Sequence, residues 1–206
     1  MSICACPNAT ALPTIPSVGC ASDFGQIQKI AFQRIHSSGT TKNAFSTTAK
    51  ITALASWTAL TAEDDGTKVV VTPFVEAPTA DGGDAITFGG GNDTLGGIVK
   101  TIGRNPVNMT FALNQFPQNV ISAMKEMQCE TDLGVFLFNE AGQIMAVKGS
   151  GDDDFSPIPI RNLFIGDLML NGLSNPDSNA MSFSFPPNWS DSVQIVTPAF
   201  NPLTDL

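Results

Sequence analysis

The side chains best suited to bind a metal or to attack a substrate in this chain are four cysteines and one histidine. Cys4 and Cys6 form a Cys-x-Cys pair, Cys20 and Cys129 stand apart, and His36 could supply one more ligand. A structural zinc site needs four ligands, with its cysteines in closely spaced pairs, and the sequence contains no second pair. We therefore expect reduced thiols, and neither a metal nor another cofactor.

Nucleophilic catalysis would have to be built around His36, which Ser37 and Ser38 follow directly. A catalytic triad needs a base and an orienting group within hydrogen-bond reach of the nucleophile, so a triad here is formally possible. The G-x-S-x-G elbow, the Walker A loop and the H-E-x-x-H motif are all absent from the sequence. The sequence predicts no enzyme, and a hydrolase centred on His36 is the alternative.

Two segments contain the oxygen-bearing side chains that hard cations prefer. Residues 89–97 resemble the calcium-binding repeat G-G-x-G-x-D-x-U-x, but one residue is missing between the glycines and that motif works in tandem copies. Asp152–Asp154 could form a cation site with Asp81 and Asp84 if the fold brought them together. Adjacent aspartates are more typical of a solvated acidic face. No metal site is predicted from either segment.

Composition restricts the partners of the chain. Among 206 residues, 10 basic and 19 acidic side chains give a net charge of −9, which opposes an electrostatic grip on nucleic acid or anionic lipid. No apolar run approaches the ~18 residues that span a membrane, so no membrane partner is expected. Tyrosine is absent, and only Trp57 and Trp189 could form a platform for a sugar ring. A carbohydrate- or cell-surface-binding domain is thus a further alternative.

Short apolar segments bounded by Asn, Asp, Pro or Gly predict many brief strands. The predicted strands cover residues 26–35, 68–72, 107–113, 133–138, 144–147, 160–170, 180–185 and 193–196. The clearest helix covers residues 117–128, with Asn114 as its cap, and a shorter helix is expected within residues 50–57. The segment 133–138 is apolar on both faces, so we expect it between a sheet and the helix or beneath a neighbouring subunit. The sequence thus predicts a mainly β fold, a β-sandwich or barrel of short antiparallel strands with one flanking α-helix.

A single domain, residues 26–197, is expected between an N-terminal arm, residues 1–25, and a C-terminal arm, residues 198–206. Proline favours an extended conformation in the N-terminal arm. The prolines in question are Pro7, Pro13 and Pro16. Within the domain, residues 77–97 are expected to form a long glycine-rich loop, and loops of this length are usually functional or mobile. We expect both arms to lie against neighbouring surfaces, including those of other subunits.

The order of elements in the second half of the chain resembles the tail tube proteins of tailed bacteriophages and of related contractile injection machines. The resemblance spans Ile27 to Val196 in outline and rests on a strand, the helix Pro117–Gln128, the hairpin Leu133–Val147 and short strands ending in Met181–Trp189. Proteins of that family are β-sandwiches with one flanking helix, and their inner sheets join into a continuous barrel across stacked rings. The cysteine-bearing N-terminal arm departs from the family pattern.

The resemblance implies a virion structural protein, a tail tube subunit that stacks as rings to form an acidic-lined conduit for DNA ejection. Its implied partners are copies of itself and other virion tail proteins, while DNA passes without specific binding. Its implied location is the virion, assembled in the cytoplasm of a host bacterium. Assembly contacts are expected in the arm and the long loop, at Cys4, Pro7, Pro13, Pro16, Asp81, Asp84, Asn92 and Asp93. A head decoration protein or a head–tail connector of similar β build is the alternative virion part.

Overall fold

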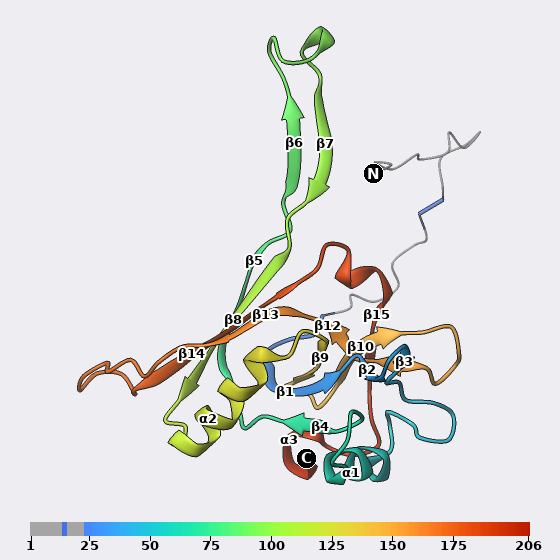
Figure 1. Ribbon diagram of the computed structural model, residues 1–206, viewed down its shortest axis with the longest axis vertical. Helices are drawn as coiled ribbons and strands as arrows, with labels where there is room; N and C mark the ends of the chain where they lie inside the picture. Colours follow the sequence, from blue (N-terminus) through green and yellow to red (C-terminus); the bar gives the residue numbers. More distant parts are fainter. Residues whose placement is uncertain (1–13, 16–22) are drawn as a thin grey trace.

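The computed structural model describes residues 14–15 and 23–206, and its fold is mainly β (Figure 1). A seven-stranded and a four-stranded antiparallel sheet share one hydrophobic core, as in a β-sandwich. The seven-stranded sheet contains β1 (Ile27–Arg34), β4 (Val69–Val71), β9 (Leu133–Asn139), β10 (Ile144–Lys148), β11 (Phe155–Ser156), β12 (Ile158–Pro159) and β15 (Val193–Val196). The four-stranded sheet has the order β13 (Arg161–Ile165), β14 (Ser178–Phe185), β8 (Val107–Asn114) and β5 (Glu76–Gly82). The remaining strands form two separate pairs, β2 (His36–Ser38) with β3 (Thr41–Lys42) and β6 (Ala85–Gly89) with β7 (Val99–Arg104). The predicted fold class is confirmed.

Three α-helices and three short 3-10 turns complete the described part of the chain. They are α1 (Leu54–Ala62), α2 (Gln118–Glu126), α3 (Pro202–Asp205), η1 (Leu95–Gly97), η2 (Met127–Cys129) and η3 (Trp189–Ser192). The helix predicted over residues 117–128 corresponds to α2 followed by η2. The prediction that Asn114 caps this helix is wrong, because Pro117 occupies the cap position and Asn114 is the last residue of β8.

The main core lies between the two sheets. Alternate residues of β8, such as Phe111 and Leu113, point inward and pack with Phe183 of β14 and with Phe32 of β1. Helix α2 closes one side of this core with Ile121 and Met124, the buried residues of its apolar stripe. Periodicity therefore identified the inward faces of these elements correctly.

Strand β9 is buried over its whole length because a second apolar cluster covers its other face. Val135 and Leu137 point into the main core, whereas Phe136 and Phe138 pack against Trp57 of α1. The expectation that both faces of this strand are covered is confirmed, but the covering element is α1 of the same chain. The cover is not α2, because α2 belongs to the main core.

The C-terminal segment folds back onto its own domain instead of leaving it as an arm. Phe200, Leu203 and Leu206 pack on the second cluster, next to α1. The ammonium group of Lys29, a residue only 7% exposed, donates hydrogen bonds to the backbone oxygens of Leu203 at 2.7 Å and Leu206 at 2.9 Å. These two hydrogen bonds from one ammonium group pair backbone oxygens at the end of α3 that have no partner within the helix, and they fix the C-terminal segment on the domain.

The prediction of a long loop over residues 77–97 is also wrong, because more than half of these residues are in strands. Residues 76–82 form β5, and residues 85–89 form β6, which pairs with β7. The glycines of this segment lie in the turns and at strand ends, with Gly82 ending β5 and Gly89 ending β6. Gly90 and Gly91, in the turn, have positive φ values that glycine adopts without strain.

Candidate functional site

The β6–β7 ribbon, residues 83–106, stands away from both sheets (Figure 1). It leaves the four-stranded sheet at the end where Gly82 of β5 pairs with Val107 of β8. Its two strands pair only with each other within the described residues. A lone two-stranded hairpin is marginally stable in water, so a ribbon of this kind gains most from a partner surface.

Apolar side chains of the ribbon are exposed to solvent. Phe88 is 56% exposed, Ile98 62% and Leu95, at the tip, 99%. Ile86 is also exposed, and it lies on the same face as Phe88 because the two are separated by one residue on a strand. Apolar surface gathered on a projection is typical of an interaction site.

The β13–β14 loop, residues 166–177, extends the same sheet at its opposite end, where Ser178, the first residue of β14, pairs with Asn114. The strand predicted over residues 160–170 therefore ends early, at Ile165. Large apolar side chains are exposed here too: Leu168, Met169, Leu170 and Leu173. The loop is nevertheless held in shape by its own hydrogen bonds.

Asn171 supplies most of those bonds in the β13–β14 loop. Its backbone N–H donates to the Asp177 carboxylate at 3.0 Å, and its side-chain amide donates to the carbonyl of Pro176 at 2.8 Å. At the base of the loop, Lys125 of α2 contacts Asp167 at 2.5 Å. The hydrogen bond from Lys125 lowers the pKa of Asp167.

On its two central strands, β8 and β14, the outer face of the four-stranded sheet is lined by small polar side chains, whereas the edge strand β13 adds the exposed Phe164 opposite Ser182. Asn108 and Thr110 alternate along β8 with inward-pointing residues, and Ser182 and Ser184 do so along β14. These groups bond to one another across the strands: Ser184 donates to Asn108 at 2.6 Å, and Thr110 is hydrogen-bonded to Thr79 of β5. The result is an even surface without protruding charged groups on its two central strands.

Charged residues of this face lie at its two edges. Glu76 and Asp81 of β5 are paired across the sheet with Ala112 and Asn108, so they belong to the outer face. Arg161 of β13 is paired with Ser184 and marks the opposite edge. One edge is therefore acidic and the other basic, and within the described residues neither edge strand has a partner on its free side.

The residues predicted to make assembly contacts divide into two groups. Cys4, Pro7, Pro13 and Pro16 lie outside the described residues. Asp81 is in β5, Asp84 lies between β5 and β6 at the base of the ribbon, and Asn92 and Asp93 are at its tip, all exposed. The sequence thus indicated the ribbon by its turn residues but missed its apolar ones, which the alternation of Ile86 and Phe88 with smaller residues could have revealed.

His36 is held by Asp132, whose carboxylate lies 2.9 Å from Nδ1 and also accepts a hydrogen bond from the His36 backbone N–H. The neighbouring Ser37 hydroxyl donates to the carbonyl of Thr41 instead. Within the described residues no hydroxyl or thiol is hydrogen-bonded to this imidazole. The geometry provides an oriented histidine but no nucleophile beside it.

Neither tryptophan is presented as an open platform. Trp57 is fully buried, and its indole N–H donates to the carbonyl of Ile51 at 2.8 Å. Trp189 is partly buried and stacks on Phe185, with ring centroids 4.2 Å apart. The sugar-binding alternative is wrong for Trp57, because a buried ring cannot meet a sugar.

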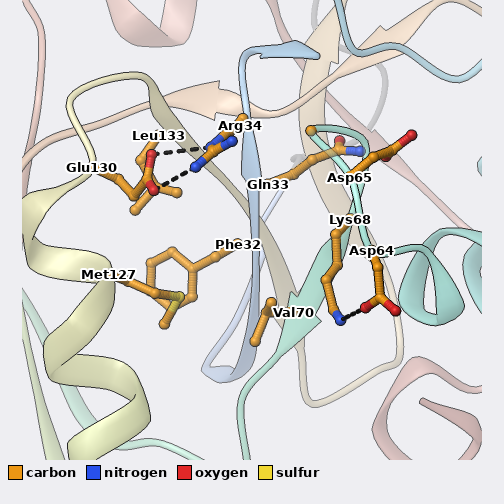
Figure 2. Close-up of a pocket in the computed structure, with 11 residues that line it drawn as sticks. Phe32, Gln33, Arg34, Asp64, Asp65, Lys68, Val70, Met127, Glu130 and Leu133 are labelled. Atoms are coloured by element: carbon orange, nitrogen blue, oxygen red, sulfur yellow. Dashed lines mark hydrogen bonds and ion pairs between the residues drawn. The ribbon is translucent and has the colours of Figure 1, made fainter. Parts of the chain in front are cut away.

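An open groove of about 430 Å³ lies between β1, β4 and η2, and Figure 2 shows its lining. Phe32 and Met127 form an apolar side, and two ion pairs flank it: Arg34 with Glu130 at 2.6 Å, and Lys68 with Asp64 at 2.8 Å (Figure 2). The hydrogen bond to Glu130 raises the pKa of Arg34. The lining residues include no serine, threonine, cysteine or histidine, and its lysine and arginine are both in ion pairs.

The acidic segment Asp152–Asp154 is compensated by lysines. Asp153 lies 3.3 Å from the ammonium of Lys50, and Lys148 donates to the backbone oxygens of Gly151 and Asp152. Among residues 14–15 and 23–206, no three histidine, cysteine or acidic side chains come together in a way that could hold a metal ion. Over the same residues, no helix has the length and apolar character needed to cross a membrane. Comparison with protein-family models, curated proteins and solved structures finds no match for this chain.

Proposed function

We propose that this protein is a self-assembling structural subunit, of the kind that forms the tail tube of tailed bacteriophages. Copies join as rings, the rings stack, and the four-stranded sheets face a central channel through which DNA passes in the virion. Copies of the chain and other tail proteins are its partners. The observation that carries the proposal is the four-stranded sheet, which no other part of residues 14–15 and 23–206 covers on its outer face or pairs with at its edges, and which bears an apolar projection at each end.

The outer face of this sheet suits a channel that DNA must cross without being held. On the two central strands, Thr110, Ser182 and Ser184 present hydroxyls and no positive charge that would hold phosphate, and the arginine of this face, Arg161, lies at the β13 edge. Glu76 and Asp81 add negative charge along β5, and a net charge of −9 per subunit repels phosphate further.

The two edges of the sheet support a ring made of identical subunits. Contact between the acidic β5 edge of one copy and the basic β13 edge of the next would bring Asp81 and Arg161 together. Pro78 has no N–H to donate and a register irregularity separates Glu76 from Thr79, so edge pairing along β5 would use Thr79–Gly82. An interface between two different edges of identical subunits closes into a ring or continues as a helix.

Sedimentation velocity over a hundredfold concentration range, combined with electron microscopy of the same samples, tests the proposal. We expect rings or tubes with a central channel above a threshold concentration. A monomer at every concentration would refute self-assembly.

A second experiment tests the channel itself. The double variant Thr110→Lys/Ser182→Lys makes the proposed channel face basic, and its tubes should retain DNA that wild-type tubes release, measured by co-sedimentation. The matched control Ala55→Lys/Ala59→Lys adds two lysines at exposed positions of α1 and should leave DNA unbound. Equal DNA retention by both variants would show that the sheet does not face the channel.

A further inference from the structure

One asparagine of the chain is followed directly by glycine, and it lies in the β13–β14 loop: Asn171, before Gly172. Asparagine is chemically labile because the backbone nitrogen of the next residue can attack its side-chain carbonyl carbon. Glycine in that next position favours the attack, since it has no Cβ to crowd the nitrogen and leaves the backbone free to turn. The sequence thus distinguishes Asn171 from the other asparagines of the protein.

The structure leaves the attacking nitrogen of Gly172 open. Every residue from Asn171 to Asp177 is exposed, and a Cβ built on Gly172 would meet nothing within 4 Å apart from its chain neighbours. The Gly172 N–H donates no hydrogen bond to any residue in the described part of the chain. Its φ of +73° lies in the region that glycine adopts without strain. The nitrogen is therefore neither shielded nor engaged in a hydrogen bond.

Other asparagines lack this combination. Asn175 is exposed in the same loop, but it precedes Pro176, whose nitrogen carries no hydrogen to lose. Asn139 and Asn179 are only 2% and 4% exposed, and their side-chain amides donate to backbone carbonyls. These three residues are controls within the same molecule for the reactivity of Asn171.

We propose that Asn171–Gly172 is a site of spontaneous deamidation. The Gly172 nitrogen bonds to Cγ of Asn171, the Cγ–Nδ2 bond breaks, and ammonia leaves with the proton of the Gly172 N–H. Water then opens the resulting succinimide ring at either of its two carbonyls, which gives aspartate or isoaspartate at this position. Each event consumes one water, releases one ammonia and adds one negative charge to the loop at neutral pH. The reaction needs no enzyme and does not depend on the proposed self-assembly.

Deamidation removes an interaction that shapes the loop. The Nδ2 group of Asn171 donates to the carbonyl of Pro176 at 2.8 Å and lies 3.2 Å from the hydroxyl oxygen of Ser178. A carboxylate only accepts hydrogen bonds, so the bond to Pro176 is lost and two acceptors face each other. The carboxylate of Asp177, which accepts the Asn171 N–H, places a second negative charge nearby. The modified loop should therefore open more often than the original one.

Peptide mass mapping of the folded protein, after incubation at mildly alkaline pH, tests the reaction. We expect the mass change of an amide converted to an acid at Asn171, with both aspartate and isoaspartate products, which electron-transfer fragmentation separates. Asn175 and Asn179 should stay intact. The inference is overturned if Asn171 of the folded protein stays intact over the time in which the urea-unfolded chain converts completely. Conversion of Asn175 or Asn179 at the same rate would overturn it too.

Two variants test the effect on the loop. Asn171→Asp introduces the carboxylate directly, and the matched control Asn175→Asp adds the same charge without removing a hydrogen bond that holds the loop. Thermolysin cuts beside apolar residues and so reports opening at the exposed Leu170 and Leu173. Asn171→Asp should be cut there about tenfold faster than the wild type, because cleavage follows the population of the open loop, whereas Asn175→Asp should be cut at the wild-type rate. Equal rates for the two variants would refute the proposed loosening.

Discussion

Removal of the β6–β7 ribbon should separate folding from assembly. Replacing Ala85–Arg104 with Asn-Gly leaves a two-residue turn between Asp84 and Asn105. These two residues are already in position for it, because the Asn105 N–H donates to the carbonyl of Asp84 at 2.9 Å, the bond that closes a four-residue turn. Asn-Gly favours the turn type that connects antiparallel strands with the correct twist.

The free energy of unfolding should change little in this variant. No residue between Ala85 and Arg104 belongs to either core cluster. With Asp84 and Asn105 included, shortening the connection from about 22 residues to about four should stabilise the fold by about 1.5 kcal/mol at most. Loss of the hydrogen bond from Arg104 to Asn188 should cost about 1 kcal/mol or less. The net change is therefore expected to stay within about 1.5 kcal/mol, or a Tm shift of about 6 °C or less.

Urea denaturation measures the free energy of unfolding, and sedimentation velocity measures assembly of the same sample. We expect a folded variant that forms no stacked particles at concentrations where the wild type forms tubes. A loss of more than about 3 kcal/mol would show that the ribbon supports the fold. A variant that still forms long tubes would show that the ribbon is not an assembly element.

Three further predictions concern the body of the protein. Lys29→Met removes both donors to the C-terminal backbone oxygens and should lower the free energy of unfolding by about 1–3 kcal/mol in urea titrations. Burial lowers the pKa of Lys29 below its usual 10.5. Just below pH 10.5 the unfolded chain therefore binds more protons than the folded chain, so the stability of the wild type rises with pH in that window. Lys29→Met should lack this rise. Trp57→Phe leaves the Ile51 carbonyl unpaired and a gap in the second cluster, and it should cost about 2–4 kcal/mol by thermal denaturation. Deletion of residues 1–20 should leave Tm nearly unchanged, because every buried residue in the described part of the chain lies at Ile27 or later. The same deletion should impair the stacking of rings seen by electron microscopy. Unfolding of the truncated chain would contradict this prediction.

The elements that sequence predicted correctly are those whose burial is periodic. Strand β8 alternates apolar and polar residues because one face meets the core, and α2 repeats apolar residues with helical spacing for the same reason. Strand β9 was recognisable as buried on both faces because all of its residues are apolar up to Asn139. A local sequence pattern is sufficient to predict an element when contact with the core determines which of its positions are apolar.

The remaining features depend on distant contacts or on surfaces with no core to face. The C-terminal segment was predicted to be an arm because its own sequence does not indicate that Lys29, far away along the chain, donates hydrogen bonds to its backbone oxygens. The ribbon was predicted to be a loop because its strands are short and the turn between them is rich in glycine. The alternation of Ile86 and Phe88 with smaller residues indicates a strand, but the sequence does not show that these side chains are exposed.

Electron cryomicroscopy of the assembled protein, at a resolution that traces the strands, tests the central claim most directly. The account predicts a tube whose channel is lined by the small polar face of β8 and β14, with Thr110 and Ser182 toward the axis. A reconstruction in which this face is turned outward, or in which another surface lines the channel, would contradict it.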